Sequence, residues 1–275
     1  MSSDALVLGI GQAFAVAYGL AIGSFLAVCI VRLPEDRSLL SSSSCPHCGA
    51  RVAWRDLVPV ASWIVLRGRC RACDGPISPL HPLVELLGGL LGWLVFRQLF
   101  VDPSDLDLAH VVAWLLRFGF LSLLVVATFV DIRHRIIPDQ TSIYAVPFGI
   151  AGAALIHWLG WDAFGWPTWR EALVGAAVWG GGFAAFAQIG HFVAGVEGFG
   201  WGDVKLVAML GAFLGLYPGT LFVLLFGSLL GSVFGVSMWV AQRRRPAIPF
   251  GPPLAAAATA YVLWGEMLLR GLWLR

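Results

Sequence analysis

Two aspartates stand beside long apolar segments, where an ionised side chain is costly. Asp131 ends the run LLVVATFVD, and Asp203 lies in GFGWGDVKL, directly before another apolar run. A carboxylate at the edge of such a segment is unfavourable unless a partner or a function offsets its cost. Both acids are therefore candidates for chemistry.

A pair of carboxylates can hydrolyse a peptide bond. One ionised carboxylate takes a proton from water, while the other, protonated, polarises the scissile carbonyl. Gly198, Gly200 and Gly202 surround Asp203 with residues that lack side chains. Glycine also tolerates dihedral angles closed to other residues, so we expect an extended substrate backbone to approach Asp203 here. The same acids also suit a proton-coupled transporter whose insert binds a partner, and the residues alone leave this alternative open.

Four cysteines form two C-x-x-C pairs, CPHC at 45–48 and CRAC at 70–73. Cys45, Cys48, Cys70 and Cys73 offer four thiolates from two tight turns, which is the ligand set of a structural zinc site. Four sulfur ligands leave no open position for water, so we expect this zinc to stabilise the fold rather than to act in catalysis. The alternative, two disulfides or a redox pair, is disfavoured in the reducing cytosol.

The segments that must position these residues are mostly apolar. The 275 residues are 59% hydrophobic and 12% charged, about half the charged fraction of a soluble domain. Eight apolar stretches are candidates for membrane-spanning helices, which need roughly 20 such residues, and they lie at 5–31, 83–101, 108–130, 141–160, 172–195, 204–216, 220–241 and 254–269. These runs are continuous and lack the period of two of a membrane β-barrel.

We predict an all-α polytopic membrane protein with about eight transmembrane helices. A small zinc-stapled cytoplasmic insert separates the first helix from the second. The predicted domains are a first transmembrane helix at 1–32, a four-cysteine zinc-binding domain at 33–82, and a seven-helix transmembrane domain with both aspartates at 83–275.

The distribution of basic residues predicts the orientation. Thirteen of the eighteen lie in alternate gaps between the apolar stretches or, for Lys205, at the start of the stretch that follows such a gap, and they are Arg32, Arg37, Arg51, Arg55, Arg67, Arg69, Arg71, Arg133, Arg135, Lys205, Arg243, Arg244 and Arg245. The positive-inside rule puts these gaps in the cytoplasm and both termini outside. Asp131 and Asp203 then lie at the same, cytoplasmic membrane face, and they meet if their helices pack together.

Several motifs, in order along the chain, resemble the type IV prepilin peptidase family of membrane aspartic proteases. They are GSFLAVCIVRLP at 23–34, the paired cysteines with PVASW at 59–63, PLVELLGG at 82–89, FVDIRHRIIPDQ at 129–140, GFGWGDVKL at 198–206 and IPFGPPLA at 248–255. The resemblance therefore covers nearly the whole chain.

The resemblance implies that Asp131 and Asp203 form a catalytic pair in the bacterial inner membrane. They would cleave a short basic leader from type IV prepilins or pseudopilins at the cytoplasmic face. Many such proteins also methylate the new N-terminal amine with S-adenosylmethionine, with a contribution from the metal-stapled insert. The expected partners are these substrates and the lipid bilayer, with no nucleic acid.

The chain departs from the family pattern at a few positions. Ala27, Leu57 and His81 lie in or beside the cytoplasmic insert, so they bear on methyl transfer more than on cleavage, and Phe199 lies before Asp203. The sequence assigns no residues to a methyl-donor site and no role to Arg117 or Glu266.

Overall fold

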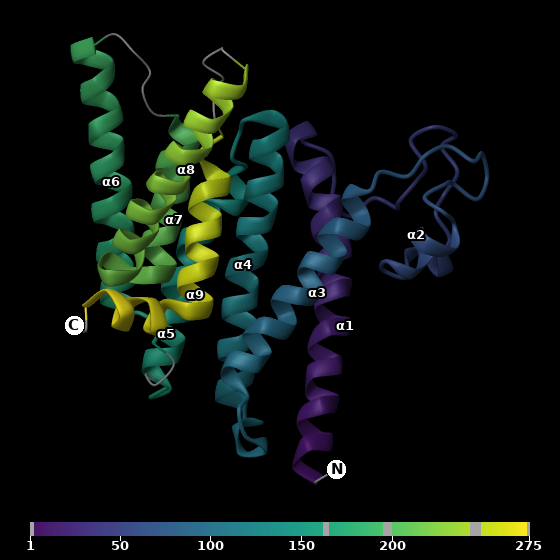
Figure 1. The fold of residues 1–275 in the computed structure, drawn as a ribbon, viewed down its shortest axis with the longest axis horizontal. Helices are drawn as coiled ribbons and strands as arrows, with labels where there is room; N and C mark the ends of the chain where they lie inside the picture. The colour runs from purple at the N-terminus through teal and green to yellow at the C-terminus, as the bar shows by residue number, and fades with distance from the viewer. Residues whose placement is uncertain (1–2, 162–164, 195–199, 243–248, 274–275) are drawn as a thin grey trace. The chain divides into compact units, whose positions relative to one another are not determined.

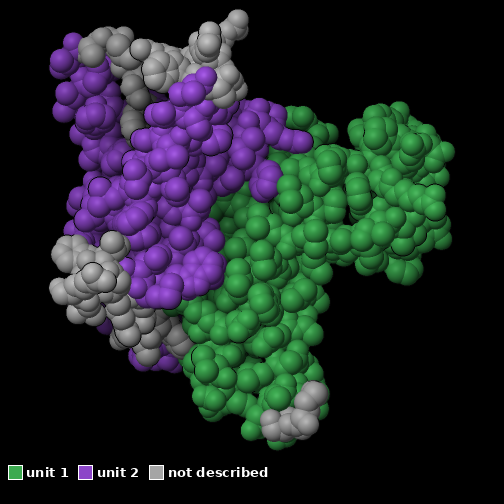
Figure 2. All heavy atoms as spheres, viewed as in Figure 1, with its two compact units in different colours: residues 1–126 green, residues 127–275 purple. Residues whose placement is uncertain are grey.

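The computed structural model describes residues 3–161, 165–194, 200–242 and 249–273. These residues form helices and turns, with strand pairing limited to isolated bridges between Ser44 and Arg51 and between Arg69 and Pro76. The all-α prediction is therefore confirmed for the described part of the chain. The chain divides into two compact units, residues 1–126 and 127–275 (Figure 2).

In the first unit, two long helices, α1 (Ser3–Arg32) and α3 (Leu80–Leu99), lie side by side (Figure 1). Glycines allow their backbones to touch. A Cβ atom added to Gly23 would lie 2.7 Å from Glu85 Cα, and one added to Gly92 would lie 2.8 Å from the carbonyl oxygen of Ala15. Such small residues are what close packing of membrane helices requires. The C-terminal end of α1 is thereby held against the first turns of α3.

Between α1 and α3, the insert contains only short helical turns. They are η1 (Leu33–Glu35), η2 (Trp54–Leu57) and α2 (Ala61–Val65). Helix α3 begins at Leu80, three residues before the predicted apolar stretch, so His81 and Pro82 belong to its first turn. Proline is tolerated there because the first N–H groups of a helix have no acceptor within the helix.

The first unit continues through η3 (Pro103–Asp105) into α4 (Leu108–His134), whose last residues belong to the second unit. The other elements of the second unit are η4 (Asp139–Thr141), η5 (Ile143–Ala145), α5 (Val146–Trp158), α6 (Trp169–Ala194), α7 (Trp201–Leu214), η7 (Gly215–Thr220), α8 (Leu221–Gln242) and α9 (Gly251–Trp273). The stretch predicted as helix from residue 141 thus becomes α-helical only at Val146, after two 3-10 turns.

Helix α7 is largely buried within the second unit. Leu206, Met209 and Leu210 have no exposed surface, and Gly211 meets the backbone of Gly175 in α6. The apolar side chains of α7 beyond its first turn are therefore enclosed by its neighbours.

Six helical stretches of the described residues are long and apolar enough to cross a membrane. They are Ser3–Glu35, Leu80–Leu99, Leu108–His134, Asp139–Trp158, Trp169–Val193 and Trp201–Met238. The last contains α7, η7 and α8, with Tyr217 in a non-helical conformation between the two helices. The chain is a multi-pass membrane protein, and the count of eight spans stays a prediction.

Candidate functional site

Asp131 lies in the last turn of α4 and is buried, with 5% of its surface exposed. Its Oδ2 accepts a hydrogen bond of 2.9 Å from the N–H of Gly251, the first residue of α9. The next two residues of α9 are prolines, which have no N–H to donate. The start of α9 thus presents a single defined donor to this carboxylate, at the helix end that favours negative charge.

Asp203 lies in the first turn of α7, as predicted. Its backbone N–H donates to the carbonyl oxygen of Gly200 at 3.0 Å. Asp131 and Asp203 lie close enough to interact electrostatically, and both acids belong to the second unit. The structure therefore places near each other two acids that are separated along the chain by two 3-10 turns and by the helices α5 and α6.

The chain that follows α4 holds these two helix ends together. Arg135 has a positive φ of 56°, which ends the helix, and the chain then places Ile137 against Gly202. Farther on, the Asp139 carboxylate accepts a hydrogen bond of 2.6 Å from Lys205 Nζ in α7. The segment after Asp131 is in this way bound to the turn that carries Asp203.

The glycines near Asp203 differ in part from expectation. Gly198 lies outside the described residues. Gly200 has φ of −70° and ψ of 142°, and Gly202 is helical, so neither uses the unusual dihedral angles that we expected. Gly202 is instead closely packed, since an added Cβ would lie 3.3 Å from Ile137 Cβ, slightly inside the ordinary contact distance. At Gly200 an added Cβ would make only an ordinary contact, 3.5 Å from Asp203 Oδ2.

The four cysteines of the insert converge in the first unit. The sulfur atoms of Cys45, Cys48, Cys70 and Cys73 all lie within 4.8 Å of one another, and those of Cys45 and Cys73 are 3.8 Å apart. A tetrahedral zinc ion with Zn–S bonds of about 2.3 Å separates its sulfur ligands by about 3.8 Å. The spacing of the thiols therefore fits a four-cysteine zinc site.

Both C-x-x-C segments fold into the same turn. The N–H of Cys45 donates to the carbonyl of Ala50, and that of Cys70 donates to the carbonyl of Gly75. After the second cysteine of each pair, Gly49 and Asp74 have positive φ values of 71° and 54°. These equivalent turns point two pairs of sulfur atoms at a common centre.

The electrostatics of the cluster favour a bound cation. The backbone N–H groups of Cys48 and His47 lower the pKa of the Cys45 thiol to about 6. The Gly75 N–H also favours the Cys73 thiolate, but the neighbouring thiols and desolvation raise the pKa of Cys73 to about 12. Four thiolates at this spacing would repel one another, and a divalent metal held among them would offset that repulsion.

Sequence reasoning did not identify Gly251 as a partner of Asp131. The motif IPFGPPLA resembles one of the prepilin peptidase family, but this resemblance gives no role to Gly251. Gly251 contributes a backbone N–H, which every residue except proline possesses. The available signal was a glycine directly before two prolines at the start of a helix. The burial of Glu85 in α3 was also not foreseen.

Comparison with known proteins accounts for both units. Residues 17–99 match the bacterial Peptidase A24 N-terminal domain, and residues 118–236 match the type IV leader peptidase family. No solved structure matches the chain.

Relatives that match over most of the chain carry the name prepilin leader peptidase/N-methyltransferase. The one from Myxococcus xanthus is 43% identical over 85% of this chain and 66% of its own length. The one from Aeromonas hydrophila is 34% identical over 92% of this chain and 90% of its own, and one from Burkholderia pseudomallei is 33% identical over 95% and 88%. With its two acids in one unit and four cysteines in the other, the chain belongs to the type IV leader peptidase family.

Proposed function

We propose that the chain cleaves the short basic leader from type IV prepilins or pseudopilins, with Asp131 and Asp203 as its catalytic pair. The observation that carries this proposal is the electrostatic interaction between the two acids in the second unit, with Asp131 buried and held by Gly251. The names of the relatives describe the same activity. The comparisons give no support to the proton-coupled transporter considered above.

The pair needs only water to hydrolyse the bond. One carboxylate takes a proton from water as the water oxygen adds to the carbonyl carbon, and the other gives its proton to the carbonyl oxygen. The carbon–nitrogen bond then breaks, the nitrogen takes a proton from the pair, and a carboxylic acid and a new N-terminal amine are released. Gly251 fixes one oxygen of Asp131, so this carboxylate is oriented before substrate arrives.

The test is mass spectrometry of a prepilin incubated with the purified chain and with its Asp131→Asn and Asp203→Asn variants. Both variants preserve side-chain size, and we expect each to lower the cleavage rate by at least about 10²-fold. Asp4→Asn is the matched control with unchanged cleavage, since Asp4 is an exposed acid in the first turn of α1. Robust cleavage by either of the first two variants would refute the catalytic pair.

We also propose that the chain methylates the amine released by cleavage, as the N-methyltransferase part of the relatives' name suggests. S-adenosylmethionine, when bound, supplies the methyl group. The same mass spectrometry experiment, with and without this donor, tests the proposal. Leader loss plus one methyl group is expected, whereas leader loss alone would leave a peptidase without methyl transfer.

For the insert, we propose that Cys45, Cys48, Cys70 and Cys73 hold a structural zinc ion. Their spacing and their shared turn geometry support this assignment. The insert, residues 33–82, would fold around the metal between the first helix, residues 1–32, and the seven-helix peptidase domain, residues 83–275. One zinc per chain is expected by elemental analysis of the purified protein, and a metal-free folded insert would contradict the proposal.

For the orientation, we propose a protein of the bacterial inner membrane with both termini outside and the active site facing the cytoplasm. The support is the placement of the basic residues in alternate gaps. Reporter fusions at the two termini, and labelling of single cysteines introduced into the insert of a variant lacking the native ones, test it. Cytoplasmic termini would reverse the assignment.

A further inference from the structure

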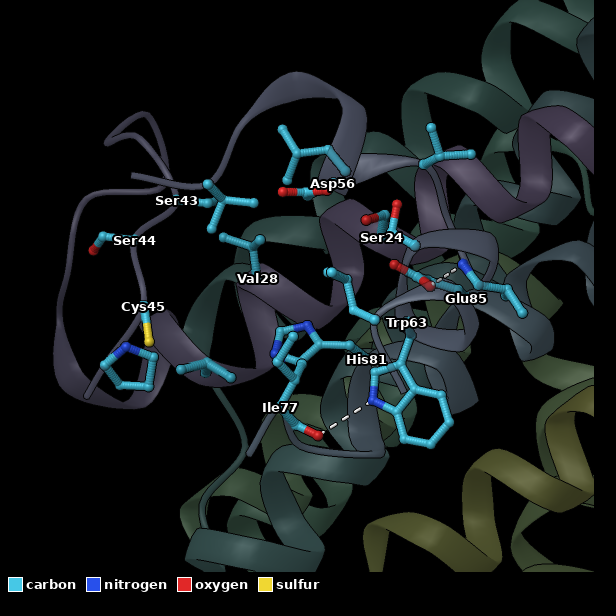
Figure 3. A pocket seen from close by; sticks show the side chains of 18 of the residues that line it. Ser24, Val28, Ser43, Ser44, Cys45, Asp56, Trp63, Ile77, His81 and Glu85 are labelled. Atoms are coloured by element: carbon cyan, nitrogen blue, oxygen red, sulfur yellow. Dashed lines mark hydrogen bonds between the residues drawn. The ribbon is translucent and has the colours of Figure 1, made fainter. Parts of the chain in front are cut away.

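A pocket of about 330 Å³ lies in the first unit, between α1, α3 and the insert (Figure 3). Ser24 and Val28 of α1 line it together with Glu85 of α3, and Trp63 and Ile77 line it from the insert. The volume falls within the range of roughly 300–1,000 Å³ for small-molecule sites. None of the residues assigned to hydrolysis contributes to it.

Glu85 gives the pocket a buried negative charge. Only 7% of the residue is exposed, and its Oε2 accepts a hydrogen bond of 2.7 Å from the N–H of Val60. Within the described part of the chain, no basic side chain forms an ion pair with it. A buried carboxylate without a cation is unfavourable, so this position favours a ligand that carries positive charge.

The other acid of the pocket already has its cation. Asp56, also in the lining, accepts hydrogen bonds on both carboxylate oxygens from Arg71, at 2.6 to 3.2 Å. Its side chain is only 9% exposed. The contrast leaves Glu85 as the acid that a ligand cation would neutralise.

Opposite charge and an aromatic ring complete the lining. Arg32 donates through Nη1 to the carbonyl oxygens of Ser38 and Ser41, at 3.0 and 2.8 Å, so its guanidinium is fixed without an ion pair among the described residues. The indole N–H of Trp63 donates to the carbonyl oxygen of Ile77 at 3.2 Å, as Figure 3 shows, which fixes the ring. Arg37 also lines the pocket, but its guanidinium is paired with Glu35. The pocket therefore combines an acid without a basic partner, the guanidinium of Arg32 and an aromatic surface, with apolar side chains between them.

We propose that this pocket binds S-adenosylmethionine, with Glu85 as the counter-ion of its cationic methionine part. The ligand carries positive charge on sulfur and nitrogen, a carboxylate suited to Arg32, and a flat purine suited to the ring of Trp63. The inference rests on the proposed methyl transfer and assigns that activity a binding site.

The test is direct binding, measured by equilibrium dialysis of S-adenosylmethionine labelled on its methyl group against the full chain purified with its metal. Saturable binding at one site per chain is expected, and Glu85→Gln should weaken it at least ten-fold. Asp36→Asn is the matched control with unchanged affinity, because it removes an exposed charge outside the pocket lining, at a positive φ of 50° that asparagine tolerates. Competition by S-adenosylhomocysteine is expected. Displacement by phosphoethanolamine, a lipid headgroup analogue, would instead overturn the adenosyl assignment.

A second variant guards against loss of folding. Val28→Phe adds volume to the pocket from α1 without removing charge, and it should also weaken binding, while the metal content of both variants reports an intact insert. Wild-type affinity in metal-loaded Glu85→Gln and Val28→Phe variants would overturn the pocket assignment. If the pocket assignment fails but the wild-type chain cleaves and methylates a prepilin, the proposed function stands. If the wild-type chain does neither, the proposed function fails, whatever the result for the pocket.

Discussion

The contact between Gly251 and Asp131 predicts a loss of activity on adding a single methyl group. In Gly251→Ala, the new Cβ would lie 2.7 Å from Asp131 Oδ2, whereas ordinary contacts begin near 3.4 Å. The carboxylate oxygen must therefore retreat by roughly 0.7 Å, and a displacement of about 1 Å at a catalytic group costs on the order of 10²-fold in rate. We expect kcat for prepilin cleavage to fall by about 10- to 100-fold.

The free energy of unfolding of Gly251→Ala should stay near the wild-type value or rise. A loss of kcat in this variant would therefore not come from unfolding. Alanine favours a helix interior over glycine by about 0.8–1.0 kcal/mol, with less benefit in the first turn. Gly182→Ala in α6 is the matched control, because an added Cβ there meets nothing within 4 Å. The assay is the initial rate at saturating prepilin, together with thermal unfolding. A wild-type kcat in Gly251→Ala, with Asp131→Asn inactive, would show that the position of Asp131 does not depend on Gly251.

Three further predictions concern the surroundings of the sites. Lys205→Met breaks the ion pair with Asp139, in which the Lys205 side chain is 34% exposed and the Asp139 side chain 42% exposed. The free energy of unfolding should therefore fall by less than about 1 kcal/mol. A larger loss, measured by denaturant unfolding, would mean that water does not screen the pair. Cys48→Ser should lower the zinc content well below one per chain by elemental analysis, because three thiolates remain; full occupancy would contradict the four-cysteine site. Asp107 accepts the N–H of His110 at the start of α4, and this bond lowers the pKa of Asp107. The stabilisation by the ionised Asp107 carboxylate is therefore present above the ordinary pKa of about 3.9, and it is lost as the pH falls through the lowered pKa of the folded protein. Asp107→Ala should accordingly lower the melting temperature at neutral pH and have no effect in stronger acid. An equal loss at both pH values would refute the contribution of the charge.

The residue types and order along the chain were enough to predict several features. Asp131 and Asp203 were identified because each adjoins a long apolar run. The four cysteines were identified because two C-x-x-C pairs in one insert are typical of a metal site. The break between two apolar stretches near residue 218 was also predictable, since proline lacks the N–H that a continuous helix needs. The structure places a non-helical Tyr217 directly before Pro218.

What the sequence did not predict depends on contacts between distant backbones. Glu85 is buried because Gly23 allows α1 to pack closely against the backbone at Glu85. The sequence around Glu85 does not indicate which helix packs there. Gly251 acts through its N–H, so its residue type carries little information about its partner. The 3-10 turns before Val146 likewise interrupt an apolar stretch. They were not predicted, because apolar composition indicates that a segment can enter the membrane but does not specify its backbone conformation.

The chemistry imposes an order on the two proposed activities. The amine that receives the methyl group does not exist until the peptide bond is hydrolysed, yet the acids lie in the second unit and the proposed donor pocket lies in the first. An Asp203→Asn chain should therefore give no methylated product from a prepilin, but it should methylate a pilin supplied with its leader already removed. Mass spectrometry of both reactions distinguishes the cases. If Asp203→Asn binds the donor and still fails to methylate the cleaved pilin, then the aspartates also take part in methyl transfer, and the separation of the two activities between the two units is wrong.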